Sequence, residues 1–150
     1  MITISQKCQY AVRAVFELAK RQGTGAIKIS EIAEAQVIPT RFLENILNNL
    51  KRAGFVESVR GKDGGYLLAR SAKELTVGEI VRSVEGPLRP VECATGGKRG
   101  ACSMYGHCVF LSLWKRAEEA LEAVYDGTTF EELVIQEAEQ TGTRALDFSI

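Results

Sequence analysis

A β-hairpin signal at residues 55–69 most strongly limits what this chain can fold into. Two short extended runs, 55–59 and 66–69, flank the segment 60–65, which reads Arg-Gly-Lys-Asp-Gly-Gly. Glycine permits the positive φ angles that a tight hairpin loop needs. The pattern therefore predicts two short antiparallel strands joined by a basic, glycine-rich tip.

Three helices are predicted ahead of this hairpin. Apolar residues recur at i, i+3, i+4 and i+7 over residues 5–20 and again from Thr40 toward Gly54, which is typical of helices with one buried face. Between them, Ser30 is expected to cap a short second helix. Three short helices followed by a hairpin predict a winged helix-turn-helix, a mainly α fold with a small two-stranded β wing.

The second half of the chain is predicted to be helical on either side of one loop. The segment 76–79, Thr-Val-Gly-Glu, is a capping box that starts a helix through Val84. A long helix is expected over residues 108–125, where a wide apolar stripe lies opposite charged residues. A last short helix is expected over 129–139, with a loose tail after Gly142.

These elements divide the chain of 150 residues into three predicted segments. Residues 1–86 are predicted to form a winged-helix domain, 87–107 a cysteine-rich loop, and 108–150 a long helix with a C-terminal tail. No apolar run is long enough to span a membrane, and the N-terminus lacks a signal-peptide pattern, so we expect a cytoplasmic protein without a membrane partner. We find no catalytic Ser/His/Asp set or phosphate-binding loop, so we do not expect an enzyme.

The distribution of charges indicates that only the N-terminal half of the chain binds a polyanion. Residues 1–70 carry 11 Lys and Arg against 6 Asp and Glu, whereas residues 71–150 carry 8 against 13. In a winged helix the third helix is the right size for a major groove, and the wing tip lies against the DNA backbone or the minor groove. The alternative is a winged helix that binds protein through the same charges. The predicted DNA-contacting residues are Thr40, Arg41, Glu44, Arg60, Gly61 and Lys62, with Asn45 and Asn48 as further candidates.

Three cysteines in the loop form a candidate ligand set. Cys93, Cys102 and Cys108 are separated by eight and five residues, whereas structural zinc sites favour pairs two to four residues apart. A wide, glycine-rich loop can surround a ligand larger than a single zinc ion, and thiolates are the usual ligands of iron–sulfur clusters. Three thiolates leave one ligand missing. Cys8, His107, a carboxylate or a residue of a second subunit are the candidates for it.

Four stretches of the chain carry a family resemblance. The segments 9–13 (Gln-Tyr-Ala-Val-Arg), 38–44 (Ile-Pro-Thr-Arg-Phe-Leu-Glu), 54–69 and 76–87 resemble the IscR/NsrR/CymR (Rrf2) family of bacterial transcription regulators. The resemblance implies a homodimer that uses the long helix as its crossing element and reads a palindromic operator in double-stranded DNA.

The resemblance also implies that Cys93, Cys102 and Cys108 bind a [2Fe–2S] or [4Fe–4S] cluster. Three features depart from the best-known sensors: the first two loop cysteines are farther apart, with eight residues between them, His107 precedes the third cysteine, and Gln9 stands at the first-helix ligand position. The leading hypothesis is a transcription regulator whose operator affinity is controlled by the cluster. The alternative is a regulator of the same fold that senses through thiol oxidation or a protein partner, without a cluster.

Overall fold

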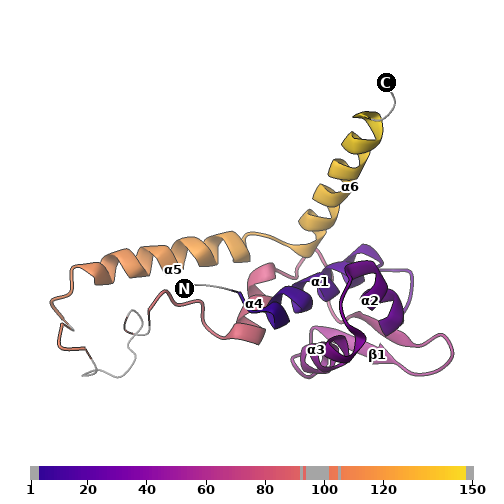
Figure 1. The fold of residues 1–150 in the computed structure, drawn as a ribbon, viewed down its shortest axis with the longest axis horizontal. Helices are drawn as coiled ribbons and strands as arrows, with labels where there is room; N and C mark the ends of the chain where they lie inside the picture. The colour runs from indigo at the N-terminus through magenta and orange to yellow at the C-terminus, as the bar shows by residue number, and fades with distance from the viewer. Residues whose placement is uncertain (1–3, 92, 94–101, 105, 148–150) are drawn as a thin grey trace.

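The structure is a computed structural model that describes residues 4–91, 93, 102–104 and 106–147 (Figure 1). Helices dominate it, with one two-stranded antiparallel sheet, as the sequence predicts. The elements in chain order are α1 (Gln6–Lys20), α2 (Ile29–Gln36), α3 (Thr40–Arg52), β1 (Val56–Val59), β2 (Gly65–Leu68), α4 (Val77–Glu85), α5 (Phe110–Asp126) and α6 (Phe130–Asp147).

Helix α1 is the centre of the core. Helices α2, α3, α4 and α6 all pack against it, and its apolar stripe is buried. Helix α3 turns its predicted stripe inward, so that Leu43, Ile46, Leu47 and Leu50 are all buried. Gly54 has a φ of 82°, which confirms its predicted role just beyond the end of α3.

The wing forms as the hairpin signal predicts. Val56 lies opposite Leu68 and Val59 opposite Gly65 in the register of the two strands. Ile27 extends the sheet by one bridge, exchanging N–H···O bonds of 2.8 Å with Tyr66. Gly65 is required at this edge, because a Cβ there would lie 2.2 Å from the carbonyl oxygen of Ile27. The wing is therefore anchored to the segment before α2.

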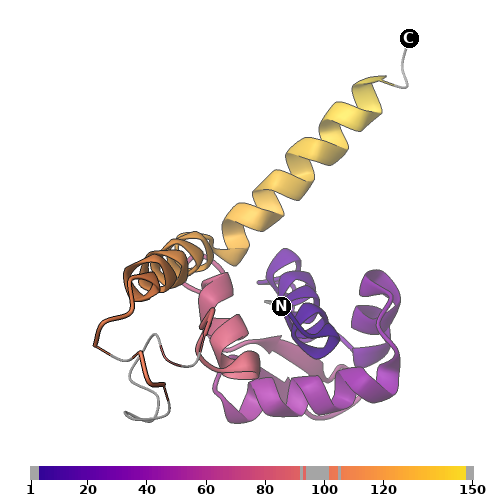
Figure 2. The ribbon, with the colours of Figure 1, turned by 60° about the vertical axis from the view of Figure 1, so that its left-hand side comes forward.

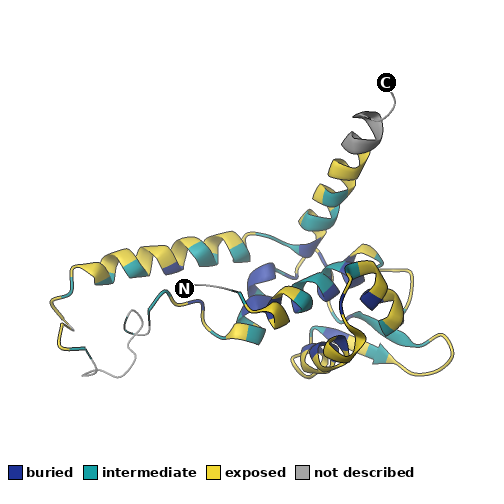
Figure 3. Cartoon of the chain, in the orientation of Figure 1, coloured by how far each residue is buried: buried dark blue, intermediate teal, exposed yellow. Residues whose placement is uncertain are grey.

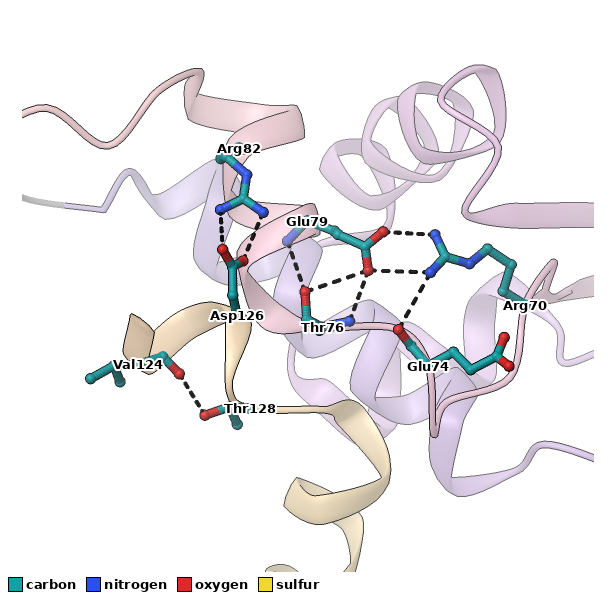
Figure 4. Close-up of polar contacts among 8 residues, drawn as sticks. All are labelled: Arg70, Glu74, Thr76, Glu79, Arg82, Val124, Asp126 and Thr128. Atoms are coloured by element: carbon teal, nitrogen blue, oxygen red, sulfur yellow. Dashed lines mark hydrogen bonds and ion pairs between the residues drawn. The ribbon is translucent and has the colours of Figure 1, made fainter. Parts of the chain in front are cut away.

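The N-terminus of α4 is fixed by a polar cluster (Figure 4). Thr76 Oγ1 accepts from the backbone N–H of Glu79, and Glu79 accepts in return from the N–H of Thr76 at 3.0 Å. This confirms the predicted capping box. Arg70 adds an ion pair of 2.7 Å to the Glu79 carboxylate, which ties the chain after the wing to the start of α4.

The junction between α5 and α6 is held against the same end of α4. Arg82 donates two hydrogen bonds to Asp126, at 3.0 and 2.7 Å (Figure 4). The N–H of Val77 donates to the carbonyl of Thr128, and the N–H of Phe130 to that of Leu75. The Phe130 side chain is fully buried in the core. Beyond this junction, α5 and α6 leave the winged helix in different directions (Figure 2).

Three predicted boundaries are wrong. Helix α2 begins at Ile29 after Lys28, so Ser30 lies inside its first turn, where Glu31 accepts from the Lys28 N–H at 3.1 Å. Helix α5 begins at Phe110 and not at Cys108. Helix α6 continues through Gly142 to Asp147 because one glycine, costing about 1 kcal/mol, does not outweigh a run of good helix formers.

Candidate DNA interface and cysteine pocket

The outer face of α3 carries a row of polar side chains along its length. Arg41, Asn45, Asn48 and Arg52 follow one another at i, i+4, i+7 and i+11, opposite the buried stripe, and all are exposed. Thr40 and Glu44 are exposed beside this row. The N-cap position belongs to Pro39, which has no side-chain hydrogen bond, so Thr40 does not cap the helix. Thr40 instead occupies the first turn.

Phe42 belongs to the same surface, although sequence reasoning did not single it out. Its side chain is 47% exposed, and the Arg41 guanidinium lies 4.8 Å from the centre of its ring. Such a cation–π contact restrains the arginine at the start of the helix. The available signal was positional, because Phe42 falls outside the apolar stripe of α3.

The wing tip presents its predicted residues to solvent. Arg60, Gly61 and Lys62 are all exposed, and Gly61 has a φ of 113°, which glycine adopts without strain. Lys51 Nζ, in the last turn of α3, donates to Ser58 Oγ on β1. Helix α3 and the wing are therefore joined into one surface.

The cations of this surface are not neutralised by ion pairs. The salt bridges among the described residues join Lys20, Arg21, Arg70 and Arg82 to carboxylates on other parts of the fold. Glu44 and Asp63 lie exposed on the same elements but form no ion pair there. Within that part of the chain, five cations of α3 and the wing have no carboxylate partner: Arg41, Lys51, Arg52, Arg60 and Lys62.

The three loop cysteines line one pocket at the start of α5. Cys93, Cys102 and Cys108 share it with Gly106, Leu111 and Trp114, and each cysteine is partly exposed and free of a disulfide. The pocket holds about 20 Å³, which is room for about one water molecule. Among the described residues, no three His, Cys, Asp or Glu side chains stand close enough to hold a single metal ion. The pocket therefore gathers the thiols without enclosing a mononuclear site.

The two candidates for a fourth ligand do not line this pocket. His107 is exposed beside Cys108, and its backbone N–H donates to the Met104 carbonyl at 3.0 Å. Cys8 is fully buried on α1. Burial, together with the neighbouring Glu85 carboxylate, raises the pKa of the Cys8 thiol to about 11. Because a metal ligand must be a thiolate, this environment disfavours Cys8 as a ligand.

Glu85 connects the start of α1 to the end of α4. Its Oε1 accepts from the backbone N–H of Ser5 at 2.9 Å and from the Ser5 hydroxyl. Ser5 in turn caps α1 by accepting from the N–H of Cys8 at 3.1 Å. Glu85 is the last residue of α4, so the chain leaves this contact directly toward the cysteines.

The family comparison identifies the fold and its general role. The family model Rrf2, described as an iron-dependent transcriptional regulator, matches residues 4–136. The chain belongs to the Rrf2 family. As an Rrf2 member it is a transcription regulator of the helix-turn-helix type, which confirms the resemblance seen in the sequence.

Individual Rrf2 relatives cover most of the chain. The regulator CymR of Bacillus subtilis is 35% identical over 87% of this chain and 88% of its own length. Its solved structure, titled as the global cysteine regulator, gives a TM-score of 0.74 over 91% of this chain and 98% of that one. The structure of T. potens IscR, 33% identical, also gives 0.74 and covers 93% of this chain and 90% of that one. These neighbours confirm the winged-helix fold class.

Among the helices that the structure describes, none combines the length and apolar character that a membrane span needs.

Proposed function

We propose that this Rrf2 protein binds a palindromic operator as a homodimer, and that an iron–sulfur cluster bound by Cys93, Cys102 and Cys108 controls its affinity for that operator. The observation that carries the proposal is the convergence of these three thiols on one pocket beside α5. The description of the family as iron-dependent supports it. Because operator DNA lies in the bacterial cytoplasm, we place the protein there.

The DNA-binding part rests on α3 and the wing. The unpaired cations of this surface attract the phosphate backbone, which supplies most of the affinity and makes it depend on salt. At the start of α3, Arg41 and Glu44 stand where side chains reach base edges; arginine donates to guanine, and a carboxylate accepts from the cytosine amino group. Arg60 and Lys62 extend the contact from the wing tip.

The cysteine pocket has the donor chemistry that a cluster requires, but at about 20 Å³ its thiols would have to spread apart to admit one. Its lining is three thiols with an apolar wall of Leu111 and Trp114, and thiolates are the standard ligands of [2Fe–2S] and [4Fe–4S] clusters. When bound, the cluster supplies a redox-active centre. Of the two predicted candidates for the fourth ligand, His107 is exposed next to Cys108, whereas Cys8 would have to leave the core.

The pocket residues are placed to influence the DNA-binding domain. Cys93 follows α4 and Cys108 precedes α5. A cluster bound by both cysteines would therefore connect the segment after α4 to the start of α5. The far end of α5 is already fixed to α4 through Arg82 and Asp126. Occupation of the pocket would therefore favour one geometry of α5 relative to α4, and a shift in that geometry changes operator affinity.

The proposal is tested by anaerobic purification. We expect visible absorption, iron and sulfide in the protein, and an operator affinity that changes when the cluster is removed with a chelator. A colourless protein with no iron after anaerobic reconstitution would instead favour sensing by the free thiols. The partial exposure of all three cysteines and the likeness to CymR, titled a cysteine regulator, support this alternative.

The homodimer part rests on α5, whose surface is largely exposed (Figure 3). Phe110, Leu113 and Val124 are 57%, 48% and 63% exposed, which leaves more apolar surface than the winged helix covers. A second copy of α5 would cover it, and the resulting two-fold symmetry matches a palindromic operator.

We expect sedimentation to show a dimer at micromolar concentration and Leu113→Glu to shift it to monomer. Lys115→Glu, which places the same charge on an exposed position of the same helix, serves as the control. A wild-type monomer at this concentration would contradict the dimer.

Arg60→Ala is expected to weaken operator binding by about 1–3 kcal/mol if the guanidinium reaches a base. The measurement is an operator titration at several salt concentrations, with Lys73→Ala as an exposed-cation control away from α3 and the wing. Wild-type affinity in the Arg60 variant would remove the wing tip from the interface.

Glu44→Ala should relax the sequence preference of the protein more than it lowers its affinity for the operator.

A further inference from the structure

Helices α1 and α3 pack directly against each other (Figures 1 and 2). A groove lies between the first turns of α1, the outer face of α3 and the last turn of α4. It consists of two adjoining hollows of about 480 and 350 Å³, which share Lys7, Ile46 and Asn49. We call it the α1–α3 groove. The polar side chains used below are Gln6, Lys7, Tyr10, Asn45, Asn49 and Arg52.

The two charged side chains that line the α1–α3 groove are both cations. Lys7 and Arg52 line it, and no aspartate or glutamate does. Neither cation forms a salt bridge with any residue that the structure describes. A hollow with two free cations and no carboxylate is complementary to an anion.

Hydroxyl and amide groups that can donate hydrogen bonds also favour an anion in this groove. Tyr10 Oη accepts a hydrogen bond from Gln6 Nε2 at 3.0 Å, so its own proton remains available to donate. The amides of Asn45 and Asn49 are exposed and can each donate two protons. The floor between these donors is apolar, formed by Ile46 and Leu50. Phosphate oxygens would meet the donors while a sugar ring would rest on the floor.

The position of the groove on the α3 surface favours DNA over a free small anion as its ligand. Asn45 and Arg52 belong to the same exposed row of α3 as Arg41, so a duplex that docks on that row also covers the groove. We propose that the α1–α3 groove binds the sugar–phosphate backbone beside each half-site, which makes the start of α1 a third DNA-contacting element after α3 and the wing. This inference rests on the proposed DNA binding.

Backbone contact and base reading have different experimental signatures. A phosphate contact weakens binding about equally on all sequences, and its loss reduces the slope of log affinity against log salt by about 1. The experiment compares Lys7→Gln, Arg52→Gln and the double variant with Lys73→Gln as control. Each is titrated on an operator selected from random duplexes and on a scrambled duplex. Because Lys7 and Arg52 are exposed, we expect unchanged thermal midpoints.

We expect each single variant to bind both duplexes several-fold more weakly, with a salt slope lower by about 1 and an unchanged ratio between the duplexes. Asn49→Asp, which adds a negative charge in the groove, should show a larger loss. Wild-type affinity and slope in all of these variants would overturn the groove proposal alone and leave the groove to a small anion. Failure of the wild type to prefer any duplex would overturn the proposed function as well.

Discussion

Alanine at any one of Cys93, Cys102 or Cys108 is expected to abolish or strongly reduce the visible absorption and iron content of the anaerobically purified protein. The reason is geometric as well as chemical, because all three thiols line the same pocket. The loss of one cysteine leaves two loop thiolates for a cluster that needs three or four protein ligands. The measurement is a visible spectrum with iron and sulfide counts for each variant, followed by operator titration.

Two further variants serve as comparisons for the cysteine series. His107→Ala should bleach or shift the spectrum if this exposed side chain supplies the fourth ligand. Cys8→Ala should leave the spectrum unchanged if the thiol stays in the core, where its raised pKa disfavours the thiolate. If all three loop variants keep wild-type iron after reconstitution, the cluster hypothesis fails and direct thiol sensing replaces it.

Phe130→Ala is expected to lower the free energy of unfolding by about 3–5 kcal/mol, the usual cost of truncating a fully buried phenylalanine. This residue is the first of α6, yet its side chain is 0% exposed within the winged-helix core. Its N–H also donates to the carbonyl of Leu75 at 3.0 Å. The substitution removes the apolar anchor that fixes the α5–α6 junction to the segment before α4.

The measurement is urea-induced unfolding followed by circular dichroism. Ile135→Ala provides a matched control, because Ile135 lies on the same helix and is 51% exposed. We expect a small change for the control. A loss below about 1 kcal/mol in Phe130→Ala would mean that the core does not depend on this anchor.

Local signals predicted most of the winged helix. The stripe from Leu43 to Leu50, the glycines of the wing and the Thr76 capping box each encode their structure within a few neighbouring residues, so they could be read without tertiary contacts. Ser30 shows the limit of this reasoning. It is a good capping residue by type, but the helix begins earlier, where Glu31 accepts from the Lys28 N–H. Helix α6 is longer than predicted because Gly142 does not end it.

The candidate sites also divide into residues that the local sequence predicts and groupings that depend on tertiary structure. Residue type and position in the predicted elements pointed to Arg41, Arg60 and Lys62, because the start of the third helix and the basic wing tip are visible in the sequence. The groove beside Lys7 was not predictable, since it requires α1 and α3 to be placed side by side. The shared cysteine pocket likewise depends on how Cys93 meets residues of α5, which spacing along the chain does not reveal.

The buried sulfur of Cys8 gives the protein an internal reporter of partial opening. The thiolate is the form that attacks alkylating reagents, and a pKa of about 11 in place of 9.0 reduces the thiolate fraction of Cys8 at neutral pH about a hundredfold. Cys8 is also inaccessible while Ser5 and Glu85 hold the ends of α1 and α4 together. In apo protein whose loop thiols have already been blocked, the remaining slow labelling therefore reports openings of the core that expose the start of α1, and no foreign probe is needed.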